Sequence, residues 1–237
     1  MQAQEWRVGA EDAIGRNTTV TLGQLKTPLG LFGAALTSAG LGRLTFPAEP
    51  YTKCEVWARR WEPQARSGQN TAALNDLAEQ LTAYLEGDLR YFRVALDLRG
   101  TPFQVAVWQA LQQIGYGELR SYGAVAAAIG RPSAVRPVGA ANGANPVPII
   151  VPCHRVIGSN GLLTGYGGGM ELKAWLLRRE GLLPAGDTER WSGGNAPARE
   201  RPVSRSGKER RQAECQKEQP GNYLQGSRGG GVADEAV

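Results

Sequence analysis

The stretch "SYGAVAAAIGRPSAVRPVGAANG", residues 121–143, decides how the second half of the chain folds. Ser121 is a typical helix N-cap, and the apolar residues after it keep helical spacing up to the Gly-Arg-Pro turn at 130–132. We expect Ser133 to cap a second short helix that ends at Gly143. Two short helices joined by a tight turn that contains glycine form a helix-turn-helix. The pattern therefore predicts a mostly helical domain built around this motif.

Further helices are predicted on both sides of the helix-turn-helix. The Thr-Pro-x-Gln sequence at 101–104 is a capping box with proline in the first helical position, and apolar residues continue one helix face after it. The last helix is predicted over "MELKAWLLRREG", residues 170–181, with Glu180 in its final turn. We assign residues 98–183 to this mostly helical C-terminal domain.

The first part of the chain has the pattern of a small α/β domain. Residues 18–46 read as short strands separated by Gly and Pro turns, and their spacing favours antiparallel pairing. The sequence "NTAALNDLAEQLTAYLEG", residues 70–87, has apolar residues at helical spacing between a polar cap and a glycine stop. "YFRVALDL", residues 91–98, alternates apolar residues like another strand. We assign residues 1–97 to this domain, so the fold class is α+β.

The rest of the chain, residues 184–237, differs in composition. It has almost no aliphatic periodicity and is rich in Gly, Pro, Ser and charges of both signs. Such a segment cannot bury enough apolar area to offset the entropy of ordering, so we expect a disordered tail. Its cysteine, Cys215, is interpreted as an exposed thiol.

The net charge of the whole chain is +5, and residues 100–183 carry seven basic side chains against three acidic ones. This excess suits an anionic partner, although small excesses of Lys and Arg are common.

The cysteine and histidine counts limit the classes of site. Cys54, Cys153 and Cys215 are too few and too scattered for a disulfide framework, which agrees with a reducing compartment and a cytoplasmic location. The chain has a single histidine, His154, which argues against zinc, and we expect no metal and no cofactor. No apolar run is long enough to span a membrane, and the first residues lack the pattern of a secretory signal, so no membrane partner is expected.

The thiol and the imidazole are neighbours in the sequence. Cys153 directly precedes His154, and a nucleophilic thiolate needs a base or a positive charge beside it. Because neighbouring side chains tend to point apart, we expect a water to bridge the two groups. The histidine also needs an orienting carboxylate, for which Glu171 and Glu180 are available. The alternatives are a buried structural cysteine and a cysteine peptidase, although a peptidase normally takes its pair from distant parts of the chain.

The second helix of the helix-turn-helix has the composition of a DNA-contacting helix. We expect its exposed side to consist of small residues, namely Gly139, Ala140, Ala141 and Gly143. Small side chains let a helix approach DNA closely, while Arg136 enters the duplex and takes the place of a displaced base. The alternative is a solvated arginine on a surface helix. The DNA-binding residues predicted here are Ser133, Arg136, Gly139, Ala140 and Gly143.

Three motifs in the second half of the chain resemble those of a known family. The signature Pro-Cys-His-Arg-Val at 152–156, the segment "ANPVP" at 144–148 and the loop "GYGGG" at 165–169 closely resemble the active-site domain of the O6-alkylguanine-DNA alkyltransferases, also called methylated-DNA–protein-cysteine methyltransferases. The resemblance is strong over residues 101–181, weaker over residues 27–47, and does not reach the tail. The zinc ligands found in the first domain of some relatives are missing.

The resemblance implies roles for individual residues. Cys153 would be the alkyl acceptor, His154 its base through a water, and Glu180 the carboxylate that orients His154. Asn145 would hold the turn that leads to the active site. Tyr122 would donate its hydroxyl to the flipped guanine and neutralise charge as the base leaves.

The resemblance also implies a pocket for the damaged base. Main-chain groups of Cys153 and Val156 would accept from the guanine amine, and Pro148 and Tyr166 would form the walls. Gly165 should leave room for the alkyl group. Gly167 stands where many relatives have serine, so only its backbone N–H could reach O6. The pocket residues predicted in this way are Pro148, Val156, Gly165, Tyr166 and Gly167.

The implied function is repair of double-stranded DNA by direct transfer. Cys153 would take the alkyl group from O6-alkylguanine, with O4-alkylthymine left open as a second substrate, and each molecule would act once, as a monomer. The base would be flipped and the DNA bound from its minor groove, as in family members. The alternative is a sensor of alkylated DNA or a helix-turn-helix regulator without catalysis, which would not need the thiol of Cys153.

Overall fold

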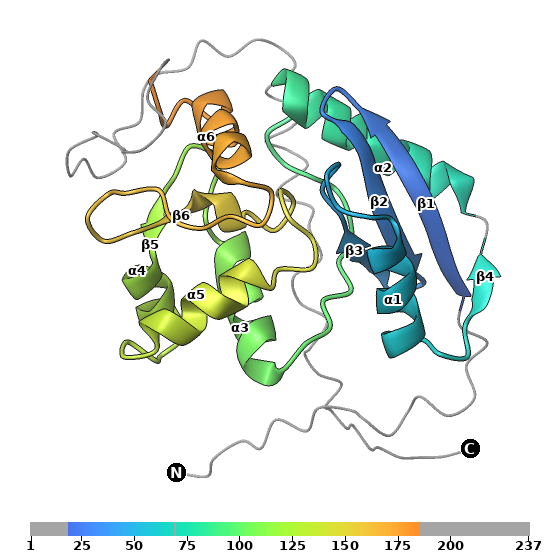
Figure 1. The fold of residues 1–237 in the computed structure, drawn as a ribbon, viewed down its shortest axis with the longest axis horizontal. Coiled ribbons are helices and arrows are strands. Elements are labelled where there is room, and N and C mark those ends of the chain that lie inside the picture. The colour runs from blue at the N-terminus through green and yellow to red at the C-terminus, as the bar shows by residue number, and fades with distance from the viewer. Residues whose placement is uncertain (1–18, 69, 185–237) are drawn as a thin grey trace, which may run out of the picture. The chain divides into compact units, whose positions relative to one another are not determined.

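The computed structural model describes residues 19–68 and 70–184, whose helices and strands are labelled in Figure 1. Its strands are β1 (Thr19–Thr27), β2 (Gly30–Thr37), β3 (Gly40–Leu44), β4 (Arg66–Gly68), β5 (Arg120–Ser121) and β6 (Val156–Ile157). Its helices are α1 (Thr52–Trp61), α2 (Thr71–Glu86), α3 (Pro102–Gln112), α4 (Tyr122–Ala128), α5 (Val135–Gly143) and α6 (Met170–Arg179), with a short 3-10 helix, η1 (Cys153–Arg155). The predicted α+β class is confirmed.

The first half of the described chain is a sheet with a helix on each face. The strand order is β3-β2-β1-β4; β1, β2 and β3 pair antiparallel as predicted, and β4 pairs parallel to β1. A side chain at Gly23 would collide with Leu74 of α2, and one at Gly33 would crowd Cys54 of α1. Gly23 is paired with Ala34, so Gly23 and Gly33 face opposite sides of the sheet. The glycines thus let α2 and α1 pack closely on the two faces.

Two features of this half differ from the sequence prediction. Helix α1 and strand β4 were not predicted, and the strand expected at residues 91–98 is wrong. That segment forms a single bridge to the edge of the sheet, in which the Leu41 amide donates to Ala95 and the Asp97 amide donates to Leu41. Alternate side chains of the segment, such as Val94 and Leu96, pack against the core. The alternation therefore reflects packing along the sheet edge and not ladder pairing.

The helix caps of the second half agree with the prediction at two of three places. Thr101 and Gln104 form the predicted capping box of α3, and the Ser121 hydroxyl accepts from the backbone of α4. The predicted Ser133 cap is wrong: α5 begins at Val135, and no side chain caps it. A turn closed by a hydrogen bond from the amide of Ala134 to Arg131, 2.9 Å long, delays the start of the helix beyond the serine.

The face of α5 also needs one correction. Ala141, expected on the exposed side, is buried, and its carbonyl accepts from the indole of Trp108 on α3 at 2.8 Å. Gly139 is half-buried, while Ala140 and Gly143 are exposed. The exposed stripe of small residues is therefore narrower than predicted.

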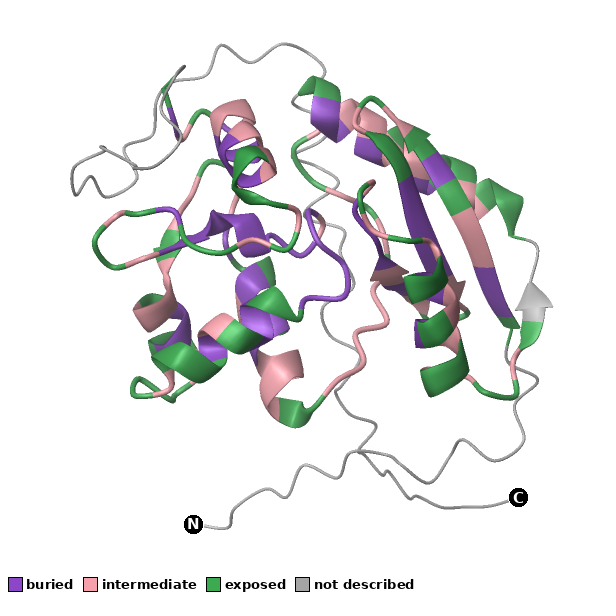
Figure 2. Cartoon of the chain, viewed as in Figure 1, coloured by how far each residue is buried: buried purple, intermediate pink, exposed green. Residues whose placement is uncertain are grey.

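One apolar core joins both halves of the described chain. It includes Phe32 and Leu41 from the sheet, Leu81 from α2, and Leu111 and Leu176 from α3 and α6. Figure 2 shows this buried layer in β2 and in the segment that follows α5. The predicted boundary between two domains, at residues 97 and 98, stays a prediction. The tail that was predicted to be disordered, residues 184–237, lies outside the described residues except for Pro184. In the described part of the chain, no helix is long and apolar enough to cross a membrane.

Candidate active site

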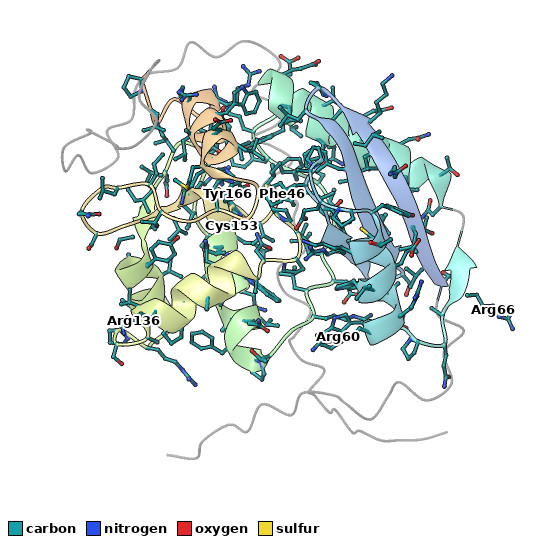
Figure 3. The ribbon with its side chains drawn as sticks, in the orientation of Figure 1. Phe46, Arg60, Arg66, Arg136, Cys153 and Tyr166 are labelled. Carbon is teal, nitrogen blue, oxygen red and sulfur yellow. The ribbon has the colours of Figure 1, made fainter. Side chains whose placement is uncertain are left out.

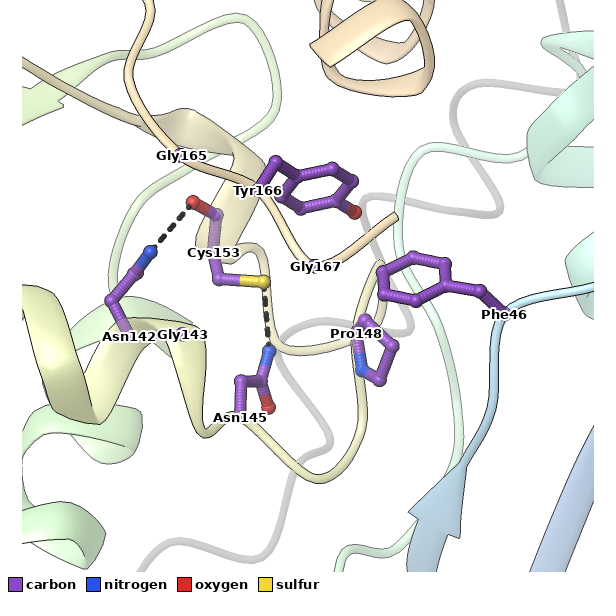
Figure 4. A pocket seen from close by; sticks show the side chains of 9 residues that line it. All are labelled: Phe46, Asn142, Gly143, Asn145, Pro148, Cys153, Gly165, Tyr166 and Gly167. Atoms are coloured by element: carbon purple, nitrogen blue, oxygen red, sulfur yellow. Dashed lines mark hydrogen bonds between the residues drawn. The ribbon is translucent and has the colours of Figure 1, made fainter. Parts of the chain in front are cut away.

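The turn between α5 and η1 is organised by one buried asparagine. The Asn145 side-chain oxygen accepts from the amide of Val147 at 3.0 Å, and its nitrogen donates to the carbonyl of Val151 at 2.8 Å. The same nitrogen lies 3.0 Å from Sγ of Cys153 (Figure 4). The turn is tight, since Ile149 has a φ of 73°, in the left-handed region that non-glycine residues rarely adopt. Asn145 therefore fixes the turn and donates to the sulfur with one side chain.

Cys153 lies at the first position of η1 and is 4% exposed. Burial raises the pKa of its thiol, while the hydrogen bond from Asn145 and the nearby charge of Lys173 oppose that rise. Burial thus favours the protonated thiol at neutral pH, and Asn145 and Lys173 favour the thiolate. A base within reach is needed to take the proton.

The base next to the thiol is held by a carboxylate. His154 is fully buried, and its Nε2 lies 2.9 Å from Oε1 of Glu180 at the end of α6. The other candidate carboxylate, Glu171, is exposed. Burial lowers the pKa of His154, against the opposing effect of Glu180. A neutral imidazole that donates from Nε2 keeps a free lone pair on Nδ1, and this buried atom has no hydrogen-bond partner among the described residues. His154 is therefore prepared to accept a proton at Nδ1.

Glu180 is surrounded by donors. Arg155 donates from Nε to Oε2 at 2.9 Å and from its terminal nitrogen to Oε1 at 2.9 Å, and the Gly117 amide donates to Oε2 at 3.1 Å. The hydroxyl of Tyr84 also donates to Oε1. Burial alone would raise the pKa of Glu180, but the hydrogen bonds and charges of His154 and Arg155 outweigh it and lower the pKa to about 2. The carboxylate is therefore ionised, and it holds the histidine in one orientation.

A buried lysine ties the loop after η1 to helix α6. Nζ of Lys173 donates to the carbonyl of Val156 at 2.6 Å and to that of Thr164 at 2.8 Å. The side chain is fully buried, and burial lowers its pKa to about 8. The two bonds fix β6 and the returning loop next to Cys153, and the lysine brings a positive charge near the thiol.

A pocket of about 250 Å³, part of it open to solvent, reaches the sulfur of Cys153 (Figure 4). Of the predicted pocket residues, Pro148, Gly165, Tyr166 and Gly167 line it, whereas Val156 does not. The carbonyls of Cys153 and Val156, expected to accept from guanine, already accept from Asn142 and Lys173. The pocket lining also includes Phe46 and Asn142, which were not predicted, and Gly143, which was predicted to contact DNA and not to line the pocket.

The remaining predicted residues lie on the side of α4 and α5. Tyr122, at the start of α4, is half-buried, and its hydroxyl accepts from Thr164 at 3.3 Å; it is not part of the pocket lining. Arg136 is exposed in the first turn of α5, at the end of the helix away from Cys153 (Figure 3). Ser133 is exposed in the preceding turn. The structure therefore separates the thiol from Ser133 and Arg136 by the length of one short helix, whereas Gly143, at the other end of α5, lines the pocket with Cys153.

The contributors to the site that sequence reasoning missed include Phe46, Tyr84, Asn142 and Lys173. Tyr84 was assigned only to the apolar face of a helix, which is where its ring packs. Lys173 gave a usable signal, because it is a charged residue between Leu172 and Ala174 in a predicted helix that must bury one face. Among the described residues, no His, Cys, Asp and Glu side chains are grouped so that they could hold a metal ion.

Two family models match the chain. The ribonuclease-like domain of 6-O-methylguanine DNA methyltransferase matches residues 20–98, and the DNA binding domain of the same protein matches residues 102–182.

Similar proteins carry a consistent name. A methylated-DNA–protein-cysteine methyltransferase of Mycolicibacterium paratuberculosis is 56% identical over 131 residues, which are 54% of this chain and 79% of that protein. The corresponding protein of Mycobacterium tuberculosis is 47% identical over 157 residues, which are 66% of this chain and 89% of that protein. A crystal structure of Mycobacterium tuberculosis OGT in complex with DNA has a TM-score of 0.58 and 44% identity, and the match covers 68% of this chain and 93% of that one.

Proposed function

The chain belongs to the 6-O-methylguanine DNA methyltransferase family, and we propose that it repairs DNA by moving an alkyl group from O6 of guanine directly onto Cys153. The observation that carries this assignment is the environment of the sulfur. Cys153 Sγ lines a pocket, accepts a hydrogen bond from Asn145, and is followed in the chain by a histidine whose Nδ1 is free to take a proton.

The transfer is a single displacement. The thiol proton passes to Nδ1 of His154 through a bridging water, since Sγ and the imidazole share no hydrogen bond among the described contacts. The thiolate then attacks the carbon bonded to O6, the carbon–oxygen bond breaks with its electron pair going to guanine, and a sulfur–carbon bond forms. The departing guanine takes a proton, for which we propose the hydroxyl of Tyr122 as the donor.

The charges around Glu180 favour this proton transfer. The Glu180 carboxylate and the Arg155 guanidinium form a buried pair that is neutral overall. When His154 becomes positive, the carboxylate at 2.9 Å stabilises the new charge without any movement of the network. Because a thioether is a poor leaving group, the alkyl group stays on the sulfur and each molecule acts once.

The DNA partner is double-stranded DNA that carries O6-alkylguanine. We propose that α4 and α5 act as the helix-turn-helix in the minor groove, with Arg136 filling the stack when the damaged base is flipped out. The exposed Ala140 and Gly143 would allow the helix to approach the backbone, together with Ser133 and the half-buried Gly139. We further propose that residues 1–97 and 98–183 are separate domains. The free thiols of Cys54 and Cys153 support a cytoplasmic location, where thiols stay reduced.

A sensor that binds alkylated DNA without reacting is the competing function, and mass spectrometry separates the two. Incubation with a duplex that contains O6-methylguanine should add one methylene to the peptide that contains Cys153, at one equivalent per protein. Cys54→Ala, which removes a buried thiol outside the pocket, should still be methylated, and Cys153→Ala should not. A wild-type protein that stays unmodified, or a Cys153→Ala variant that gains the methylene elsewhere, would overturn the proposed function.

A further inference from the structure

Phe46 comes from the sheet-bearing half of the chain but lines the pocket that reaches Cys153 (Figure 4). It follows β3 by two residues and is 5% exposed. The end of β3 is tied to the active-site turn by the main chain, because the amide of Leu44 donates to the carbonyl of Pro146 at 2.9 Å. The Phe46 amide donates to the carboxylate of Glu49 at 3.1 Å. These bonds hold the ring in a fixed place beside the turn that carries the thiol.

The ring of Phe46 is enclosed by the glycine loop on its other side. Its centroid lies 5.3 Å from that of Tyr166, with the two planes at 68°. A methyl group added at Gly168 would come within 2.8 Å of the ring, and one added at Gly167 would lie 3.4 Å from it. The loop therefore passes closely over the phenylalanine, and the ring takes space that side chains at these positions would otherwise occupy.

The pocket has an apolar side and a polar side. Phe46, Pro148 and Tyr166 form the apolar side, while Asn142 and Asn145 lie near the sulfur on the other. A guanine ring offers hydrogen-bonding groups along its edge, whereas the alkyl group on O6 offers none. The alkyl group is therefore the part of the substrate that suits the side formed by Phe46.

We propose that Phe46 is a specificity-determining residue that limits the size of the alkyl group transferred to Cys153. The inference rests on the proposed function, and it assigns part of the substrate choice to the sheet-bearing half of the chain. A methyl group fits against the ring without displacing it. An arylmethyl group such as benzyl needs space that the ring fills, and the ring cannot retreat because the glycine loop and the core enclose it.

The test compares the rates at which Cys153 takes methyl and benzyl groups from matched duplexes containing O6-methylguanine or O6-benzylguanine. Phe46→Leu and Phe46→Ala should raise the ratio of benzyl to methyl transfer at least tenfold, and Phe46→Trp should lower it. Phe32→Leu is the matched control, because Phe32 is buried in the neighbouring strand and does not line the pocket; its ratio should stay at the wild-type value. Thermal unfolding of each variant confirms that the protein compared is folded.

The outcomes separate the two proposals. Ratios that stay at the wild-type value in Phe46→Leu and Phe46→Trp, with methyl transfer intact, would overturn the role of Phe46 and leave the proposed function standing. An equal change in Phe32→Leu would also overturn it, since the effect would then come from general loosening of the core. A wild-type protein that takes no alkyl group from either duplex would overturn the proposed function and the role of Phe46 with it.

Discussion

The hydroxyl of Tyr84, on α2, donates a hydrogen bond to the same oxygen of Glu180 that lies 2.9 Å from Nε2 of His154. Tyr84 and Glu180 are 96 residues apart in the sequence, and Tyr84 is fully buried. Its hydroxyl also lies 3.4 Å from Nε2 of His154. The sheet-bearing half of the chain is therefore connected directly to the group that we propose accepts the thiol proton.

Tyr84→Phe should slow alkyl transfer while leaving the fold intact. Loss of the hydroxyl removes one donor from Glu180, so His154 is less firmly oriented and its pKa rises. We expect a roughly tenfold slower transfer, equivalent to about 1.4 kcal/mol for one hydrogen bond to a carboxylate, and a pH–rate midpoint moved to higher pH. Tyr116→Phe is the control, because that hydroxyl bonds only to the main chain of Arg179 among the described contacts. Equal losses of rate in the two variants would contradict the prediction.

Glu180→Gln should reveal the acid-dependent part of the stability. The pKa of Glu180 is about 2 in the fold against an ordinary 4.5, so its ionised form stabilises the protein above pH 4.5 and this stabilisation is lost as the pH falls towards 2. At pH 7 the variant leaves the buried Arg155 without its counter-charge and should unfold about 3–5 kcal/mol more easily.

Urea unfolding at several pH values measures this difference. The gap between wild type and Glu180→Gln should be widest near pH 7 and should narrow steadily below pH 4.5 as the wild-type carboxyl is protonated. Glu171→Gln, on the exposed first turn of the same helix, should unfold like the wild type throughout. A gap that is constant across the pH range would show that Glu180 does not titrate as described.

Lys173→Met should slow transfer at pH 7 by more than tenfold. The variant removes a positive charge near the thiol of Cys153, so the thiolate is less favoured, and it leaves the carbonyls of Val156 and Thr164 without their donor.

In the wild type, burial lowers the pKa of Lys173 from 10.5 to about 8. The unfolded chain therefore binds more protons between these values, and the free energy of unfolding should rise with pH in that window. Stability curves that rise equally in Lys173→Met and in the exposed control Lys26→Met would contradict this assignment.

The local elements could be predicted because their signals lie in adjacent residues. Thr101 and Gln104 bond each other's backbone, and Asn70 accepts from the third residue after it, so a few letters specify each cap. Ser133 failed because a turn formed by main-chain bonds, to which its side chain does not contribute, set the start of α5. The segment 91–98 failed because alternation reports which side chains are buried and does not report which backbones pair.

The site could be predicted only where the chain or the family resemblance brings its parts together. Cys153 and His154 are neighbours in the sequence, and Glu180 was implied by the resemblance. Phe46 and Tyr84 lie in other elements, and Tyr84 reaches His154 across 70 residues of sequence. Locally both are ordinary core aromatics, since their packing against the core is what any buried aromatic shows. Their contacts in the site, at the pocket for Phe46 and at Glu180 for Tyr84, depend on how the two halves pack together, and no local sequence pattern predicts that packing.

Arg136→Ala should separate the handling of DNA from the chemistry. Arg136 is exposed in the first turn of α5, and it lies away from the pocket that holds Cys153. If it fills the stack after the damaged base leaves, its removal should lower transfer from duplex DNA about 10- to 100-fold, because flipping costs a few kcal/mol that the arginine helps to offset. Transfer from the free base O6-methylguanine needs no flipping and should keep the wild-type rate.

The matched control for this variant is Arg60→Ala, which removes one exposed charge from α1, on the other half of the protein (Figure 3). It should reproduce any effect of net charge alone, so both variants should lose the same small amount of non-specific, salt-dependent binding. An equal loss of duplex repair in Arg60→Ala would assign the effect to charge and remove Arg136 from the base-flipping step. A loss of transfer from the free base in Arg136→Ala would place the defect in the pocket, because no duplex is present in that reaction.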